Sequence, residues 1–441
     1  MGEMKVSQSS TPRFSYTRLK AACLRRRPPP GDAGNIEELE REDRYYLLHQ
    51  ATQLGPVFSG QGTERSWVCI IGLARCRRFL QAHTKNLHGY MHDLEPMVPG
   101  GALRRMEGEI HRKYRKALLS GIEFDTLFLE DQALHDIVSE ALARYEGSTG
   151  QEHDSAHSYI DTLNEIATAS LIRVFFGVGT GQPLFKTLLR GYKKLGPFGL
   201  VWNIGTQQTI AFAEIRKALL DFMNDSDDKE KRHFDNSIAG KLAANHVLDD
   251  TLLGNLIYMV EMGRYDLAGL LRWLSRYGAA HPHHLDRLAS ESNEQAKRQD
   301  SFAYAFVLET LRTDKSERLT RIVERDLLFE GYLIPRDTYV RLCLWEAHHE
   351  PATFVKPFEF NPERFMRESY GRDQFAPFGL DHHICPLADI SIRLCVVFLW
   401  QMATRYRLQG VADGLAVRGA YHWEPALDFS VVLQRRSDTS A

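Results

Sequence analysis

One long helical stripe between Asp249 and Leu274 constrains the fold more than any other feature of this chain. Apolar side chains recur there at helical spacing over roughly 25 residues, which is typical of a helix that crosses a whole domain. The acidic pair Asp249-Asp250 stands where a helix amino terminus is favoured. The stripe consists of Leu252, Leu253, Leu256, Ile257, Val260, Leu267, Leu270, Leu271 and Leu274.

Composition allows a core large enough to surround such a helix, because 43% of the 441 residues are hydrophobic and 25% are charged. No repeat or low-complexity tract interrupts residues 35–441, so we expect a single domain there. Residues 102–312 are mostly helical in pattern, residues 321–345 resemble the short strands of a small sheet, and helix resumes after Cys385. The predicted fold class is mainly α with a small β part.

Residues 1–34 differ from the rest, with seven basic side chains against two acidic ones. They contain no apolar run long enough for a membrane span of roughly 20 residues. We interpret them as a basic flexible leader. The alternative is a short amphipathic helix on a membrane surface, formed by residues 15–27.

The net charge of −2 does not favour a nucleic-acid partner. The six cysteines are irregularly spaced and form no CxxC pair, so neither a disulfide framework nor a zinc ribbon is indicated. We therefore expect a cytoplasmic protein, and a monomer.

The stretch "APFGLDHHICPLADI", residues 376–390, places His382, His383 and Cys385 within four residues. Structural zinc needs four ligands, usually from two separated pairs, and these residues do not supply them. A nucleophilic cysteine with a histidine base is a second interpretation, for which the sequence gives no supporting signal. The third is an axial thiolate for haem iron, because an apolar loop that opens a helix supplies NH groups and an apolar shell.

This stretch resembles the haem-binding loop of the cytochrome P450 family, in particular of soluble, bacterial-like members. Asp381 and Leu387 stand where that family has glycines. Asp tolerates positive φ, whereas a leucine implies a shifted helix or a repacked surface against the porphyrin. The residues that match the family's pattern are Phe378, Gly379, His383 and Cys385.

Further segments follow in the family's order, and the resemblance covers roughly residues 40–435. "ETLR" and "NPERF" supply a predicted buried ion network that supports the cysteine loop, formed by Glu309, Arg312 and Arg364. A carboxylate can accept from two arginines bidentately. The resemblance implies that the carboxylates of haem b are held by His111, Arg115, Arg321 and His383, with Phe378 beside the haem and Cys385 on the iron; His382 is expected to face solvent.

The long helix departs from the family's oxygen-activating motif. By count from His281-Pro282, the motif falls on residues 262–266, where only Gly263 survives and Asp266 takes the threonine position. We expect Asp266 to face the apolar side and to have a raised pKa, so that it can donate protons. The alternatives are a structural ion pair for Asp266 and a close helix contact at Gly263. Arg264 resembles the arginine with which certain peroxygenases hold a substrate carboxylate, but it is two residues short of that position, so we expect a surface or inter-helix arginine.

The resemblance implies an oxidoreductase, most simply a monooxygenase that oxidises a small apolar, secondary-metabolite-like substrate. Electrons are expected from a separate ferredoxin and its reductase or a similar donor. Residues 88–101 and 196–205 are candidate pocket walls by analogy. A peroxide-using peroxygenase, a non-oxygenating isomerase or cyclase, and a non-catalytic haem sensor or scaffold remain alternatives.

Overall fold

The computed structural model describes residues 27–31, 34–89, 94–122, 132–148, 158–196, 204–225, 233–315, 319–410, 416–418, 423–426 and 428–436. Two compact units are present, each assembled from segments that are distant in sequence. The first unit takes residues 1–90, 317–355 and 371–382, and the second takes residues 91–316, 356–370 and 383–441. The expectation of a single domain stays a prediction.

A five-stranded sheet with strand order β1-β2-β7-β4-β3 forms the centre of the first unit. β2 and β7 are parallel, and the other neighbours are antiparallel. The β-branched and apolar residues of β2 and β7 alternate between two core clusters, so both surfaces of the sheet are covered. The strands are β1 (Val57–Gly60), β2 (Trp67–Ile71), β3 (Leu87–Gly89), β4 (Leu319–Val323) and β7 (Tyr339–Cys343), with a separate hairpin of β5 (Leu327–Phe329) and β6 (Tyr332–Ile334).

Short helices flank this sheet: α2 (Ile36–Glu42), α3 (Tyr46–Leu54), α4 (Leu73–His83), the 3-10 turn η1 (Thr84–Asn86) and α17 (Leu344–Ala347). The end of the predicted leader also contacts strands of this unit. The Arg27 carbonyl accepts from Leu333 N at 2.9 Å, and the Pro30 carbonyl accepts from Ser59 N at 2.7 Å. Residues 1–26 of that leader lie outside the described residues.

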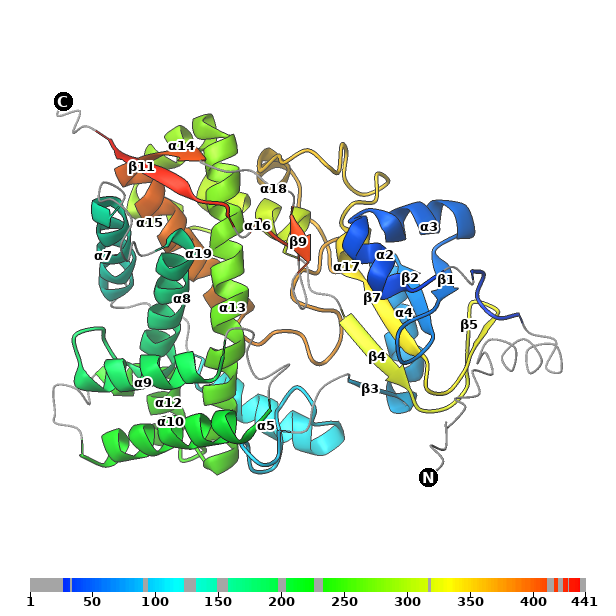
Figure 1. Ribbon diagram of the computed structural model, residues 1–441, viewed down its shortest axis with the longest axis horizontal. Coiled ribbons are helices and arrows are strands. Elements are labelled where there is room, and N and C mark those ends of the chain that lie inside the picture. The colour runs from blue at the N-terminus through cyan, green and yellow to red at the C-terminus, as the bar shows by residue number, and fades with distance from the viewer. Residues whose placement is uncertain are drawn as a thin grey trace, which may run out of the picture. The chain divides into compact units, whose positions relative to one another are not determined.

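The second unit is arranged around α13 (Asp250–Ala280), a helix of 31 residues. Its N-cap is Asp249, whose carboxylate accepts from Leu252 N at 2.8 Å. The helix ends at Ala280, and its C-cap His281 is followed by Pro282. α8 (Tyr159–Phe176) runs beside α13 (Figure 1). Tyr159 of α8 donates to Ser275 Oγ of α13 at 2.5 Å. The predicted long helix is therefore confirmed and lies in the core of its unit.

The other helices of the second unit are α5 (Gly108–Ser120), α7 (Gln132–Ser148), α9 (Pro183–Lys194), α10 (Thr206–Asp225), α12 (Ile238–Ala244), α14 (Pro282–Ala289), α15 (Asn293–Ala296), α16 (Phe302–Thr313), α18 (Glu363–Arg367) and α19 (Ala388–Arg405). Two small hairpins pair β8 (Tyr406–Gly410) with β11 (Val431–Arg435) and β9 (Val417–Arg418) with β10 (Trp423–Glu424). This composition confirms the predicted class, mainly α with small sheets. Among the described residues, no helix combines the length and the apolar character that a bilayer crossing requires.

Candidate functional site

Cys385 is the one cysteine of the described residues that is partly exposed. Burial raises the pKa of the Cys76, Cys343 and Cys395 thiols, which keeps those sulfurs protonated. Cys385 precedes α19 by three residues, and a helix amino terminus favours a negative charge. Of these cysteines, Cys385 is therefore the one placed to act as a thiolate ligand.

The first half of the cysteine loop is tied to the first unit by two side chains that sequence reasoning missed. Arg77 donates to the Leu380 carbonyl at 3.0 Å and forms an ion pair with Asp373 at 2.6 Å. His348 Nε2 accepts from Ala376 N at 3.0 Å. Gly379 has φ 106°, a conformation that only glycine adopts without strain, so this predicted loop glycine has a structural requirement.

The two departures from the family's glycines do not need glycine conformations here. Leu387 is the N-cap of α19 with φ −112°, and Asp381 is not among the described non-glycine residues with positive φ. We expected the departure at Asp381 to be mild because aspartate tolerates positive φ, and the backbone there does not call on that tolerance. Leu387 is buried against its own unit, and its backbone imposes no strain at the start of α19.

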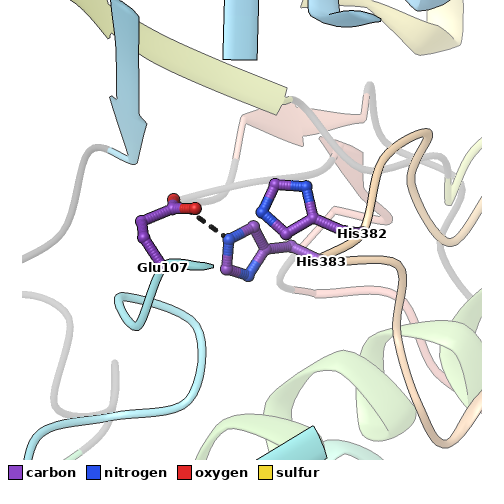
Figure 2. A group of neighbouring side chains, drawn as sticks. All are labelled: Glu107, His382 and His383. Carbon is purple, nitrogen blue, oxygen red and sulfur yellow. Dashed lines mark hydrogen bonds and ion pairs between the residues drawn. The ribbon is translucent and has the colours of Figure 1, made fainter. Parts of the chain in front are cut away.

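Two histidines predicted to hold haem carboxylates lie together in the second unit. His111, on α5, is buried, and its ring centroid lies 4.3 Å from that of His383. His383 Nε2 is 3.2 Å from Glu107 Oε1. A dashed line marks this contact in Figure 2. Arg115 follows His111 by one helical turn and is half-buried. These side chains place hydrogen-bond donors for a carboxylate near one another; His382 is exposed, as expected.

The predicted three-residue ion network forms in the second unit. Glu309 and Arg312 on α16 are fully buried, and Arg312 binds both oxygens of Glu309 at 2.8 and 2.9 Å. Arg364 on α18 reaches Glu309 Oε1 at 3.0 Å. Arg312 also donates to the Pro357 carbonyl at 2.8 Å. The network thus fixes residues 357–364, the segment that precedes the cysteine loop in sequence.

Arg321, the predicted carboxylate ligand on β4, makes a contact that the sequence did not indicate. Its guanidinium forms an ion pair with the carboxylate of Asp381, and it donates to the Thr320 carbonyl at 3.0 Å. Both partners of the ion pair belong to the first unit. Spacing along the sequence could not reveal this contact, because the two residues are 60 positions apart.

The central helix corrects one prediction. Asp266 is exposed rather than buried, so the desolvation that we expected at this carboxylate is absent. A helix turns by roughly 100° per residue, so Asp266 lies about 120° around the axis from Val260, away from the centre of the apolar stripe. Gly263 does make the close helix contact that was the alternative, since a Cβ there would lie 3.3 Å from Leu171 Cδ1 of α8.

Arg264 is an inter-helix arginine. It is buried, pairs with Glu261 one turn earlier at 2.8 Å, and donates to the Tyr192 and Gly196 carbonyls at 2.9 and 3.0 Å. Burial raises the pKa of Glu261, and the charge of Arg264 opposes that shift. Sequence reasoning missed Glu261, although its i, i+3 spacing to Arg264 was visible.

The two predicted pocket walls are described only in part. Residues 90–93 of the first segment and 197–203 of the second lie outside the described residues. The described donor set of the second unit consists of one partly exposed thiol, two adjoining imidazoles and the half-buried Arg115. The thiol can bind iron as a thiolate, and the imidazoles and the guanidinium can donate to the haem carboxylates. The residues present therefore fit a haem.

Comparison with known proteins agrees with this chemistry. Residues 279–411 match the family model "Cytochrome P450". The chain is 23% identical to abscisic acid 8'-hydroxylase 1 of Arabidopsis thaliana, over 73% of this chain and 72% of that protein. It is 25% identical to an abscisic acid 8'-hydroxylase of Solanum lycopersicum, over 88% and 87%. Beta-amyrin 11-oxidase of Glycyrrhiza uralensis is 23% identical over 76% and 74%.

Solved structures show the same fold. Retinoic acid bound cyanobacterial CYP120A1 superposes with a TM-score of 0.71 at 18% identity, covering 93% of this chain and all of that one. A zebra fish cytochrome P450 with abiraterone gives 0.67 at 16% identity, covering 89% of this chain and all of that one. The fold is that of cytochrome P450, and the three comparisons together support that family. A soluble, bacterial-like character stays a prediction.

Proposed function

We propose that this chain is a haem-dependent monooxygenase with Cys385 as the axial ligand. Its similarities support a family that holds haem by a cysteine thiolate. The observation that carries the proposal is the placement of Cys385. It is the partly exposed cysteine among those described, and it stands before the amino terminus of α19. Haem with a thiolate ligand supplies activation of oxygen when it is bound.

The remaining site residues orient and neutralise the cofactor. His111, Arg115 and His383 present donors to its carboxylates. Arg321 is proposed for the same role from the resemblance alone. Phe378 is partly exposed and is proposed to lie beside the ring. The buried network around Glu309 keeps the segment before the cysteine loop in place, so the thiolate is presented from a rigid support.

The substrate class follows from the named relatives. Abscisic acid and beta-amyrin appear in the names of proteins similar to this chain, and both relatives are named as a hydroxylase or an oxidase. We propose a small apolar, terpenoid-like secondary metabolite as the substrate. Electrons are proposed to come from a ferredoxin with its reductase or a similar donor, and the working form is proposed to be a cytoplasmic monomer.

Proton delivery is assigned to Asp266 on α13. An exposed carboxylate exchanges protons with water, so Asp266 is proposed to relay a proton from solvent. Gly263 brings α8 and α13 close together and thereby fixes this part of the helix. Arg264 is committed to Glu261, which argues against its use as a clamp for a carboxylate substrate in a peroxygenase.

The absorption spectrum of the reduced protein under carbon monoxide tests the proposal. The protein is expressed with haem precursor, reduced under carbon monoxide and compared with Cys385→Ser and with Cys395→Ala, a buried cysteine of α19. A strongly red-shifted Soret band in the wild type and in Cys395→Ala, absent in Cys385→Ser, is the expected result. A band at the histidine-ligated position, or the absence of haem, would refute thiolate ligation.

Turnover then separates the alternatives. Product formation with a reduced electron donor and oxygen supports the monooxygenase. Product formation with peroxide alone would favour a peroxygenase. Conversion of the substrate in the absence of both oxygen and peroxide would favour an isomerase or cyclase. Intact haem without any conversion would favour a sensor or scaffold.

A further inference from the structure

Three histidines stand at the junction between α13 and α14. His281 is both the C-cap of α13 and the N-cap of α14, and His283 and His284 lie in the first turn of α14. His283 is exposed and the other two are partly exposed, so solvent reaches all three residues. Imidazole is the commonest metal ligand among protein side chains and suits late transition-metal ions. The proposed function uses none of these three residues.

The three rings are spaced much as ligands of one ion would be. Ring centroids lie 4.1 Å apart for His283 and His284, 5.5 Å for His281 and His284, and 6.0 Å for His281 and His283. A zinc–nitrogen bond of about 2.0–2.1 Å puts each ligating ring centroid about 3.2 Å from the metal. Two such centroids are then about 5.2 Å apart at a tetrahedral angle and about 4.5 Å apart at a right angle. The observed distances all lie within about 1 Å of these values.

Two of the rings pack against a shared aromatic neighbour. His281 stacks on Phe360, with centroids 5.4 Å apart and an interplanar angle of 19°, and His284 lies 6.3 Å from the same ring. His284 also packs against Phe302 at 5.3 Å. Ligands that packing already orients lose less entropy when a metal binds. The donor atoms of the three histidines do not all lie within 4.8 Å of one another, so binding requires a ring to turn, and His283 is the exposed one.

The charges around these rings also suit a cation. Burial lowers the pKa of His281 and of His284, and the nearby His283 lowers both further. Both rings are therefore neutral near pH 7, which is the form that binds a metal. The Glu363 carboxylate acts electrostatically on His284 and forms an ion pair with Arg287 of α14. It supplies negative charge near the amino terminus of α14, where the helix dipole alone would disfavour a cation.

We propose that His281, His283 and His284 form a binding site for one divalent late transition-metal ion, such as Ni²⁺ or Zn²⁺. Water completes the coordination. Because His281 ends α13 and His284 belongs to α14, a bound ion links the two helices across their junction and stabilises it. All three residues belong to the second unit, and the site involves neither Cys385 nor haem, so this inference does not rest on the proposed function.

Isothermal titration calorimetry of Ni²⁺ into the full chain tests the proposal, with the urea midpoint of unfolding as a second readout. His283→Ala removes the exposed ligand and leaves the packing of the other two rings in place. His246→Asn is the matched control, because His246 is an exposed histidine of the same unit whose φ of 53° asparagine tolerates. We expect His283→Ala to bind Ni²⁺ at least about tenfold more weakly than the wild type and the control. Ni²⁺ should also raise the urea midpoint of the wild type more than that of His283→Ala.

A second variant, His281→Gln, removes a ligand that packs on Phe360 and should weaken Ni²⁺ binding in the same way. Urea unfolding without metal shows whether either variant is still folded. A Ni²⁺ affinity that either folded variant leaves unchanged overturns the three-histidine site, because the ion would then bind elsewhere. An equal loss in His246→Asn also overturns it. Mg²⁺ prefers oxygen ligands, so binding of Mg²⁺ that His283→Ala weakens equally would overturn the assignment to imidazole.

Discussion

Replacing Glu309 by Gln should destabilise the protein more than any other single change in the ion network. The Glu309 carboxylate is fully buried. It accepts from Arg312 at 2.8 and 2.9 Å, from Arg364 at 3.0 Å and from the backbone N–H of Asn361 at 2.8 Å. A glutamine keeps the shape but leaves two arginines without their counter-charge. Loss of one partner from a buried pair costs about 3–5 kcal/mol, and we expect the upper part of that range.

Urea unfolding followed by the helical circular dichroism signal measures this loss. Glu294→Gln is the matched control, because Glu294 pairs with Lys297 at the same i, i+3 spacing but is 83% exposed, so the change should cost about 0–1 kcal/mol. Arg364→Met removes only one of the two cations and should cost less than Glu309→Gln. A loss below about 1 kcal/mol for Glu309→Gln, or the reverse order of the two variants, would refute the reasoning.

Three further changes test other parts of the structure. Gly379→Ala should lower the free energy of unfolding in urea by about 1–3 kcal/mol, because φ is 106° there. Gly181→Ala, at a position with open space around it, should not cause such a loss. Equal losses in the two variants would contradict the conformational argument. Asp266→Asn should change the unfolding free energy by less than about 0.5 kcal/mol, because Asp266 is exposed, while coupled turnover falls; intact coupling would remove its proposed role. Burial among aromatic rings lowers the pKa of His284 from 6.5 to about 4, so protonation of this imidazole opposes folding. The unfolding free energy should therefore fall as the pH drops from 6.5 to 4. His284→Gln should flatten that dependence, and an unchanged slope would exclude His284 as its source.

The parts of the site that sequence predicted are those set by short spacing or by an ordered set of motifs. Glu309 and Arg312 share a helix surface at i, i+3, so their contact follows from helix geometry. The resemblance to cytochrome P450 motifs supplied the predicted grouping of His111 with His383, and their ring contact is present. The long stripe predicted α13 because a 3.6-residue periodicity sustained over such a length is typical of a helix and of no strand or loop.

The parts that sequence did not predict depend on contacts between distant segments or on a precise rotation about a helix. Arg321 and Asp381 meet only after a strand and a loop have packed in one unit. Asp266 lies close in sequence to the apolar stripe, but its angle around α13 leaves it exposed. The order of the five-stranded sheet was equally hidden, since it interleaves strands from residues 57–89 with strands from 319–343.

The pairing of β2 with β7 has a consequence for biosynthesis. β7 leaves the ribosome about 270 residues after β2, because Trp67 pairs with Tyr339. At roughly 5–20 residues per second, β2 waits on the order of 15–50 s for this neighbour. During that interval an edge carrying Val68 and Ile70 is open to pairing with other chains. Translation speed across residues 72–338 should therefore affect the yield of folded protein, and a chaperone that shields this edge should matter most before β7 is made.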